Sequence, residues 1–398
     1  MRILLISGEF SPMQGGVGDF THELGKELAA LGCQVSVITS KAAGSRRQVD
    51  GVAVFPIIEK WDWRCWAIIL KLLRELKPDV VNIQYQTAAY GMHPAINLLP
   101  RRLRRESRRP RVVVTYHDLR EPYLFPKAGP LRRWITREPA RQSDAVIVTN
   151  HEDEWRMANG EWRIANLARI PIGSNIAPMP PADYDRDAWR ARWGAGPGDL
   201  LLAYFGFLNE SKGGETLIRA LAEVVAHGMP ASLLMIGGQV GSSDPTNVAY
   251  LRQIEALIAE LSLDERVMWT GYTPADEVSA NLLAADVCVL PYRDGVSFRR
   301  GSFMAALAHG CAIVSTEPRV PVPELRDEEN ILLIPPDDPA ALARAITRLA
   351  ENADLRRRLG AGAANLAQHF TWEKIAAQTL ALYETLLDSH EEHLCSAN

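Results

Sequence analysis

The 398-residue chain contains no apolar run that approaches the roughly 20 residues of a membrane-spanning helix. Its apolar start, Ile3–Ile6, is too short for a signal peptide and continues into a turn. Five cysteines, odd in number and without CxxC spacing, favour reduced thiols over disulfides or a zinc site. No aspartate pair or histidine cluster has the spacing of a metal ligand set. We therefore expect a cytoplasmic protein with no bound metal and no resident cofactor.

The charge of the chain is unevenly distributed. Residues 1–180 hold 26 lysines and arginines against 18 acidic residues, a net charge of +8, whereas residues 181–398 hold 18 against 30, a net charge of −12. Much of the basic excess lies in Arg101–Arg111, which has seven arginines and one glutamate. Such a segment attracts phosphate, which favours a peripheral position on an anionic membrane surface or binding of an anionic acceptor. A solvated helix end is the alternative. No nucleic-acid-binding motif accompanies the segment, so we expect no nucleic acid partner.

Apolar runs alternate with amphipathic segments along the whole chain, which predicts parallel sheets covered by helices on both faces. The length exceeds what one hydrophobic core serves, so we expect two domains, residues 1–175 and 185–365, and closing helices at 366–398. A proline-rich segment, Ile172–Asp185, is the expected linker. The predicted strands are Ile3–Ser7, Val35–Thr39, Val52–Pro56, Val80–Gln84, Val112–Tyr116, Ala145–Thr149, Ala168–Pro171, Leu201–Phe205, Ser232–Ile236, Val267–Thr270, Val287–Leu290, Ala312–Ser315 and Ile331–Ile334.

The same structural opening occurs twice. A strand within Arg2–Phe10 is followed by the glycine-bearing turn Ser11–Phe20 and a helix, and a strand at Leu201–Leu208 is followed by Asn209–Gly214 and a helix. The free amides and the positive dipole end of such a helix attract anions. One such opening in each half predicts two sheets that face one cleft, with a phosphorylated ligand between them.

Six segments, in chain order, resemble those of the family 4 glycosyltransferases. They are GEFSPMQGGVGDFTHELGKELAALGCQVSVIT, VVVTYHDL, YFGFLNESKGGETLIRAL, AADVCVLPY, LAHGCAIVST and VPELRDEENILLIPPDDPAALARAI. The resemblance implies the GT-B fold, an α/β architecture of two Rossmann-like, doubly wound parallel-sheet domains that face a cleft. It also implies transfer of a sugar from a nucleotide diphosphate sugar, with retention and without a metal, to a glycan, a lipid-linked molecule or a small acceptor. The acceptor would bind to the first domain and the donor to the second.

The resemblance assigns roles to three positions of the first domain. Gly15 and Gly16 would let the backbone contact the diphosphate or the donor sugar, although a plain turn explains them too. His117, at the end of an apolar strand, would lie against the donor sugar, beyond the carboxyl end of the sheet where ligands bind. A structural histidine is the alternative there. Asp118 is read either as part of this site or as a cap of the following turn.

Lys212 follows the second glycine-bearing turn, where its ammonium suits a diphosphate whose charge grows as the sugar leaves. The family commonly has an arginine five residues earlier, and this chain has Phe207 in its place. One expected phosphate-binding cation is therefore missing.

A larger departure lies in Asp294–Gly310. The family commonly carries two glutamates here, and Ser297 and Ala305 stand in their places. Arg299 and Arg300 stand at a predicted helix N-terminus, where they oppose the dipole unless an anion lies there. We therefore expect them to supply the missing cationic charge, with a solvated position as the alternative. Further candidate donor contacts are Tyr272, Asp294, Gly295, Ser302 and Glu324.

Two questions stay open at this point. The tryptophans of Trp61–Trp66 suit a membrane interface or an acceptor groove, or else cover the domain's own core. The missing glutamates leave room for a non-catalytic sugar-nucleotide-binding protein, and a nucleotide-sugar epimerase or hydrolase is a rival within enzymes. The resemblance implies a hexosyltransferase-type enzyme.

Overall fold

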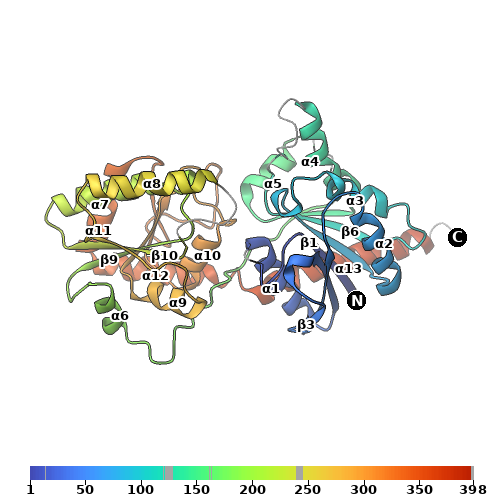
Figure 1. Ribbon diagram of the computed structural model, residues 1–398, viewed down its shortest axis with the longest axis horizontal. Helices are drawn as coiled ribbons and strands as arrows, with labels where there is room; N and C mark the ends of the chain where they lie inside the picture. The colour runs from blue at the N-terminus through green and yellow to red at the C-terminus, as the bar shows by residue number, and fades with distance from the viewer. Residues whose placement is uncertain are drawn as a thin grey trace. The chain divides into compact units, whose positions relative to one another are not determined.

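The computed structural model describes residues 1–13, 15–119, 121, 129–160, 162, 164–238 and 245–395. The chain divides into two compact units (Figure 1). Unit 1 comprises Met1–Gly173 and Thr371–Asn398, and unit 2 comprises Ser174–Phe370.

The described residues of unit 1 form an eight-stranded sheet in the order β3-β4-β2-β1-β5-β6-β7-β8. All neighbouring strands are parallel except β3 and β4. Every strand expected from the sequence in this half is present, within a few residues at its ends. The bounds are β1 Arg2–Ser7, β2 Gln34–Ser40, β3 Arg47–Val49, β4 Val52–Ile58, β5 Val80–Tyr85, β6 Arg111–Tyr116, β7 Ala145–Val148 and β8 Leu167–Arg169.

Strand β3 was not expected from the sequence. It pairs antiparallel with β4 through the turn Asp50-Gly51, in which both residues have positive φ, 47° and 80°. Such a turn matches the twist of a two-residue hairpin. The strand is short and two of its three residues are polar, so it carries no apolar run.

Helices cover both faces of the unit 1 sheet. One apolar core lies under α2, α3, α4 and α5, and the other lies under α1 and the C-terminal helix α13. Helix α13 therefore returns to unit 1, where it runs beside α1 (Figure 1). The bounds are α1 Gly16–Ala30, η1 Lys41–Ala43, α2 Cys65–Leu76, η2 Ala88–Tyr90, α3 Ala95–Leu103, α4 Pro130–Gln142, α5 His151–Ala158 and α13 Trp372–Cys395.

A buried polar chain fastens α13 to the sheet. The Tyr383 hydroxyl of α13 accepts a hydrogen bond of 2.6 Å from the Asn82 side chain of β5, whose oxygen accepts one of 3.0 Å from Thr115 of β6. All three side chains are buried. Because unpaired buried polar groups are costly, these bonds fix the helix in one position.

The described residues of unit 2 form a six-stranded, wholly parallel sheet in the order β11-β10-β9-β12-β13-β14. The strand order reverses direction between β9 and β12, so a crevice opens at the carboxyl ends of these two strands. The bounds are β9 Leu200–Phe205, β10 Ala231–Ile236, β11 Val267–Trp269, β12 Val287–Leu290, β13 Ile313–Thr316 and β14 Leu332–Ile334.

The helices of unit 2 also cover both faces of their sheet. Helices α7 and α8 lie on one face, with α11 packed on α7, and α9 and α10 lie on the other, with α12 packed on α10 (Figure 1). The bounds are α6 Arg186–Arg192, η4 Glu210–Lys212, α7 Gly214–Ala226, α8 Pro245–Glu260, α9 Ala275–Ala284, α10 Gly301–Ala308, α11 Pro339–Glu351 and α12 Ala353–Ala367.

Candidate active site

The loop after β9 is held tightly against the loop after β12. Gly213, between η4 and α7, has φ 71°, and a Cβ there would lie 1.9 Å from the carbonyl oxygen of Pro291. The Arg293 amide donates a hydrogen bond of 3.0 Å to the Ser211 carbonyl. Only glycine fits such an approach, and the contact fixes Lys212 at the carboxyl edge of the sheet.

Lys212 faces an aromatic ring there. Its Nζ lies 5.0 Å from the centroid of the Tyr292 ring. Burial, together with the positive charges of Arg300 and Arg299, lowers the pKa of Lys212 to about 7, although Asp294 acts in the opposite direction. A lysine amine with such a pKa is readily protonated when an anion arrives.

Tyr292 is the centre of this group. The ring is fully buried, and its hydroxyl shares a hydrogen bond of 2.7 Å with the hydroxyl of Ser302 in α10. Burial raises the pKa of the Tyr292 phenol, so the hydroxyl stays protonated. The Cζ of Arg300 lies 4.7 Å from the same ring centroid, within the range of a cation–π contact.

Arg299 and Arg300 precede α10 and both pair with Asp294. The Arg299–Asp294 distance is 3.2 Å, and Arg300 makes an even closer ion pair with the second oxygen of this carboxylate. The side chains of Arg299 and Arg300 are only 23% and 11% exposed, so the solvated alternative is wrong. The anion that offsets two arginines near a helix N-terminus is thus Asp294 of the same chain. The two arginines thus occupy the Asp294 carboxylate, which we had expected to contact the nucleotide-sugar donor.

The group as a whole is positively charged. Lys212, Arg299 and Arg300 against Asp294 leave a net charge of +2 when the lysine is protonated. Nε of Arg300 is buried and has no hydrogen-bond partner among the described residues. A buried donor of this kind is costly unless a ligand or water accepts from it. Chemically, the arrangement suits a diphosphate.

The other expected residues of unit 2 lie around this group to different extents. Ser297 is buried, and its Oγ lies 3.5 Å from the Arg299 amide. Gly295, at φ 79°, lies where a Cβ would meet the Glu317 carbonyl at 2.6 Å. Their position in the Asp294–Arg300 loop makes them supports of the arginines.

The other three expected contacts have different surroundings. Phe207 is 46% exposed, and its ring covers the position where a side chain on Gly238 would lie. Tyr272 is 76% exposed on the turn after β11. Glu324 is partly buried and its carbonyl accepts from Asn330. Their assignment to the donor stays a prediction.

In unit 1, a carboxylate occupies the N-terminus of α1. Oε1 of Glu9 accepts hydrogen bonds from the amides of Val17 and Gly18, at 3.1 and 3.3 Å. Burial raises the pKa of Glu9, while these two amides act in the opposite direction. A Cβ on Gly15 would collide with this carboxyl group, whereas the corresponding space at Gly16 is open. Amides that we expected to meet the donor phosphate therefore hold Glu9.

His117 directly follows β6 and is held by two neighbours. Its Nε2 lies 3.0 Å from Oε1 of Gln84, and its ring packs edge-on against Phe20 with 4.7 Å between centroids. Burial lowers the pKa of His117 to about 3, so the ring is neutral at physiological pH. A neutral imidazole can orient a hydroxyl but cannot neutralise a phosphate. The adjacent Asp118 carboxylate accepts from Gln86 at 3.4 Å.

The tryptophan segment is mostly core. Trp61 is buried and its Nε1 donates to Ser40, and Nε1 of Trp66 donates to the Ala95 carbonyl. Trp63 is 48% exposed. The interpretation that these residues cover the domain's own core therefore holds for two of the three.

Within the basic segment the arginines divide into two groups. Arg102 pairs with Glu106, and Arg109 and Arg111 pair with Asp144. The remaining side chains, Arg101, Arg104, Arg105 and Arg108, lie exposed at the surface.

Sequence reasoning missed three residues of the site. The sequence predicted Tyr292 only as the residue that follows an apolar strand. Its position directly before the charged pair Arg293-Asp294 was a signal that its ring could contact a cation. The sequence held no clear signal for Glu9 or Gln84, because an acidic residue in a turn and an amide side chain in a strand can have many different partners. Their partners became visible only in the fold.

Two family models match the chain. The "Glycosyl transferase 4-like domain" matches residues 15–173, and "Glycosyl transferases group 1" matches residues 199–352. The first match lies within unit 1 and the second lies within unit 2. With the two parallel sheets and their GT-B neighbours, they define a glycosyltransferase of the group 1, GT4-like type.

Individual relatives agree with this class. The D-inositol 3-phosphate glycosyltransferase of Streptomyces bingchenggensis is 28% identical, and the alignment covers 96% of this chain and 89% of that protein. Sucrose-phosphate synthase of Thermosynechococcus elongatus has a TM-score of 0.77 at 24% identity, with 98% and 99% of the chains covered. Anabaena HepE in complex with UDP-glucose has a TM-score of 0.72 at 18% identity, with 96% and 99% covered. The two structures show the GT-B fold.

Two further observations concern membranes and metals. Among the described residues, no helix is both long and apolar enough to cross a bilayer. In the same parts of the chain, no three His, Cys, Asp or Glu side chains gather as a group that could hold a metal ion.

Proposed function

We propose that the protein transfers a hexosyl group from a nucleotide diphosphate sugar to an acceptor, with retention and without a metal ion or cofactor. The observation that carries this proposal is the cationic group in which Lys212 and Arg300 contact the Tyr292 ring and Arg299 pairs with Asp294. Its net charge of +2 balances a diphosphate dianion. Fixed cations aimed at a leaving group lower the barrier because they need no rearrangement as charge develops.

The proposed reaction is a front-face substitution. The bond between C1 of the donor sugar and the diphosphate oxygen breaks while the acceptor oxygen bonds to C1 on the same face. The acceptor proton passes to the departing phosphate oxygen, so charge balances without a protein base. Lys212, Arg299 and Arg300 stabilise the diphosphate, and neutral His117 provides a hydrogen-bonding group for a sugar hydroxyl.

Relatives suggest which donor to test first. Structures of Anabaena HepE hold UDP and UDP-glucose. We propose a nucleotide sugar of this kind as donor, with Tyr272, Glu324 and Phe207 as candidate contacts to its base, ribose or phosphates.

For the acceptor we propose a glycan or a lipid-linked molecule, reached at an anionic membrane surface. The support is the exposed set of Arg104, Arg105 and Arg108 on unit 1. Each arginine near such a surface contributes about 1 kcal/mol of attraction. The protein would then lie peripherally on the membrane.

The decisive experiment is product analysis with UDP-sugars and a panel of acceptors, in the presence of a chelator. We expect transfer, with the anomeric configuration of the donor kept in the product by NMR. Activity that disappears with chelator and returns with magnesium or manganese would contradict the metal-independent reaction. Tight nucleotide-sugar binding without turnover on any acceptor would favour a non-catalytic binding protein.

A further inference from the structure

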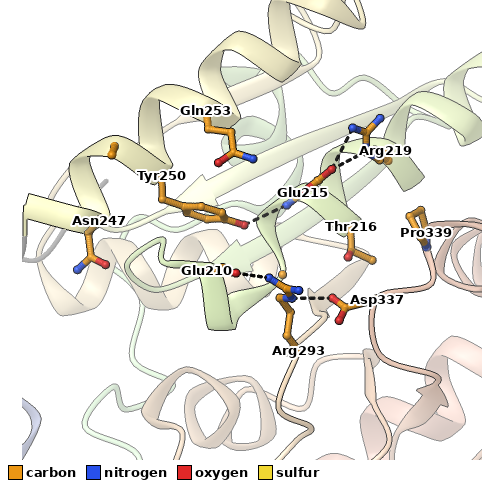
Figure 2. A pocket seen from close by; sticks show the side chains of 12 residues that line it. Glu210, Glu215, Thr216, Arg219, Asn247, Tyr250, Gln253, Arg293, Asp337 and Pro339 are labelled. Carbon is orange, nitrogen blue, oxygen red and sulfur yellow. Dashed lines mark hydrogen bonds and ion pairs between the residues drawn. The ribbon is translucent and has the colours of Figure 1, made fainter.

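A polar cavity of about 650 Å³ lies in unit 2 between the N-terminal turns of α7, the first half of α8 and the loops after β12 and β14 (Figure 2). Its volume is within the range of small-molecule sites. The described lining includes none of Lys212, Asp294, Arg299 or Arg300, so this cavity is distinct from the cationic group assigned to the diphosphate.

The charged groups of the cavity are already paired with one another. Arg293 binds Glu210 at 2.6 Å and Asp337 at 2.9 Å, as Figure 2 shows. Arg219 binds Glu215 at 2.9 Å. Two cations against three carboxylates leave a net charge of −1. An anion would have to displace a carboxylate from each guanidinium, and a cation would have to compete with each guanidinium.

The N-terminus of α7 offers no free anion site here either. The Glu215 amide donates a hydrogen bond of 3.2 Å to the hydroxyl of Tyr250, which reaches it from α8 (Figure 2). This bond fixes the Tyr250 side chain between the two helices and leaves its ring in the wall of the cavity.

The remaining polar lining is neutral and mixed. Thr216 contributes a hydroxyl, and Asn247 and Gln253 contribute amides that both donate and accept. The paired arginines and carboxylates, whose side chains are 43–76% exposed, add further donors and acceptors. A compound rich in hydroxyl groups matches such a lining, because each hydroxyl also donates and accepts. The Tyr250 ring presents a π-face, whose negative potential attracts the weakly positive C–H groups of a sugar.

We propose that this cavity binds a neutral saccharide, as a site separate from that of the donor nucleotide. The inference goes beyond the proposed reaction, since it concerns residues that the reaction does not use. A free oligosaccharide and the end of an acceptor or product glycan share this chemistry.

The same cavity is connected to the cationic group through Arg293. This residue ties η4, which carries Lys212, to the loop that carries Asp294, through its ion pair with Glu210 and the hydrogen bond that its backbone amide donates to the Ser211 carbonyl. Asp294 in turn holds Arg299 and Arg300. A saccharide that engages Arg293 therefore alters the loops that hold the diphosphate, and linkage requires the nucleotide to alter saccharide affinity equally.

The test uses the full chain and three neutral probes, maltotriose, cellotriose and mannotriose, measured by saturation-transfer NMR and calorimetry. We expect at least one probe to bind. Asn247→Ala with Gln253→Ala should raise its Kd about tenfold, since two neutral hydrogen bonds are lost. Arg252→Ala, an exposed position on the same helix outside the cavity, is the matched control and should change nothing. Failure of all three probes, or equal binding by the double variant, overturns the site.

Two further arms separate this inference from the proposed function. Lys212→Ala should weaken UDP binding and leave probe binding intact; weakening of both would place the saccharide in the donor site and overturn the proposal. Inorganic phosphate should not displace the probe, and displacement would show an anion site instead. Arg293→Ala should remove any effect of the probe on the Kd of UDP, expected to be several-fold in the wild type. Probe binding with an unchanged UDP Kd would overturn the coupling.

Discussion

The guanidinium carbon of Arg300 lies 4.7 Å from the centre of the Tyr292 ring. Lys212 approaches the same ring to 5.0 Å, so one buried aromatic side chain contacts two cations, whose mutual repulsion contributes to the lowered pKa of Lys212. The ring is itself fixed by its hydroxyl bond to Ser302. Tyr292 thus sets the geometry of the positive charge at the edge of the unit 2 sheet.

Removing the lysine tests this charge directly. Lys212→Ala should lower turnover on the order of a hundredfold, which is the scale for one charge-stabilising donor. It should also weaken UDP binding in calorimetry, while the melting temperature stays near that of the wild type. Arg252→Ala is the control, and an unchanged affinity for UDP would contradict the assignment of Lys212.

Removal of Arg299 and Arg300 should weaken the binding of the nucleotide's phosphates and leave the binding of its nucleoside part unchanged. A charge-assisted contact to phosphate contributes about 1.5–3 kcal/mol, so Arg299→Ala with Arg300→Ala should raise the Kd of nucleoside diphosphate tenfold to hundredfold. The Kd of the free nucleoside should not change. Because the double variant leaves the Asp294 carboxylate without these arginines, Asp294→Asn is added to it, so that Lys212 is the one charge left in the group. Equal loss for nucleoside and diphosphate would mean that the arginines contact the base or ribose.

The pH dependence of nucleotide binding follows from Lys212. Its pKa in the free protein is about 7, below the usual 10.5, and a bound diphosphate raises this pKa because it favours the ammonium. Affinity should therefore be constant below pH 7 and fall as the pH rises above it, with uptake of a proton on binding. The free energy of unfolding should change in the opposite direction. It should rise with pH from about 7 to the usual lysine pKa of 10.5, because over this range the unfolded chain binds the proton and the folded protein does not.

Unit 2 offers a clean measurement of this titration, because Lys212 is its only lysine. Reductive methylation with a carbon-13 label gives one signal from this unit, assigned with Lys212→Arg. Its midpoint should lie near pH 7 without UDP and move upward with UDP. A midpoint near 10 in the free protein would contradict the burial of this ammonium.

The exposed arginines of unit 1 should bind anionic vesicles. At low salt the wild type should sediment with vesicles of phosphatidylglycerol, and added salt should release it by screening. Arg104→Gln, Arg105→Gln and Arg108→Gln together should also release it. The triple variant Arg252→Gln, Arg319→Gln and Arg344→Gln makes the same change in net charge on unit 2 and should sediment normally. Equal sedimentation of both variants would contradict membrane binding by Arg104, Arg105 and Arg108 and would leave these residues only a role in solubility.

The carboxylate at α1 makes a separate prediction. Glu9→Gln removes the charge that lies against the amides of Val17 and Gly18 while keeping an acceptor oxygen. Because burial raises the pKa of Glu9, the charge costs stability in the folded protein, and its removal should leave stability unchanged or raise it, with the lost helix-dipole interaction offsetting about 0.3–1 kcal/mol of the gain. Thermal melting at neutral pH measures this. If Glu9 also repels donor phosphate, the variant should bind UDP more tightly, and weaker binding would instead assign Glu9 a supporting role.

The sequence predicts the sheets of this protein better than its side-chain partners. A short, continuously apolar run such as Leu201–Phe205 is typical of a strand that is buried on both faces of a sheet. Its length and its lack of polar residues therefore predict the strand. Strand β3 lacks such a run, and only its Asp50-Gly51 turn marks it. The position of Lys212 was similarly readable, because a glycine-bearing turn places the next residues at the sheet edge.

Pairings between segments were harder to predict, because they depend on how loops fold back. Arg299 and Arg300 could be read as cations near a helix, but their shared partner Asp294 could not, since a turn at Gly295 brings it back to them. The Glu9 contact has the same origin. It depends on the course of the chain between β1 and α1, which composition does not specify.

The bond between Tyr383 and Asn82 has a consequence for synthesis on the ribosome. Unit 1 is discontinuous, and residues 174–370 are an insertion between its sheet and its last helix. When residues 1–173 have emerged, the face of the sheet that α13 covers is still bare, and Asn82 lacks its tyrosine. Domains generally fold as units in the order of synthesis. Here residues 174–370 are synthesised before α13, so the core of the amino-terminal unit closes only after α13 has emerged from the ribosome.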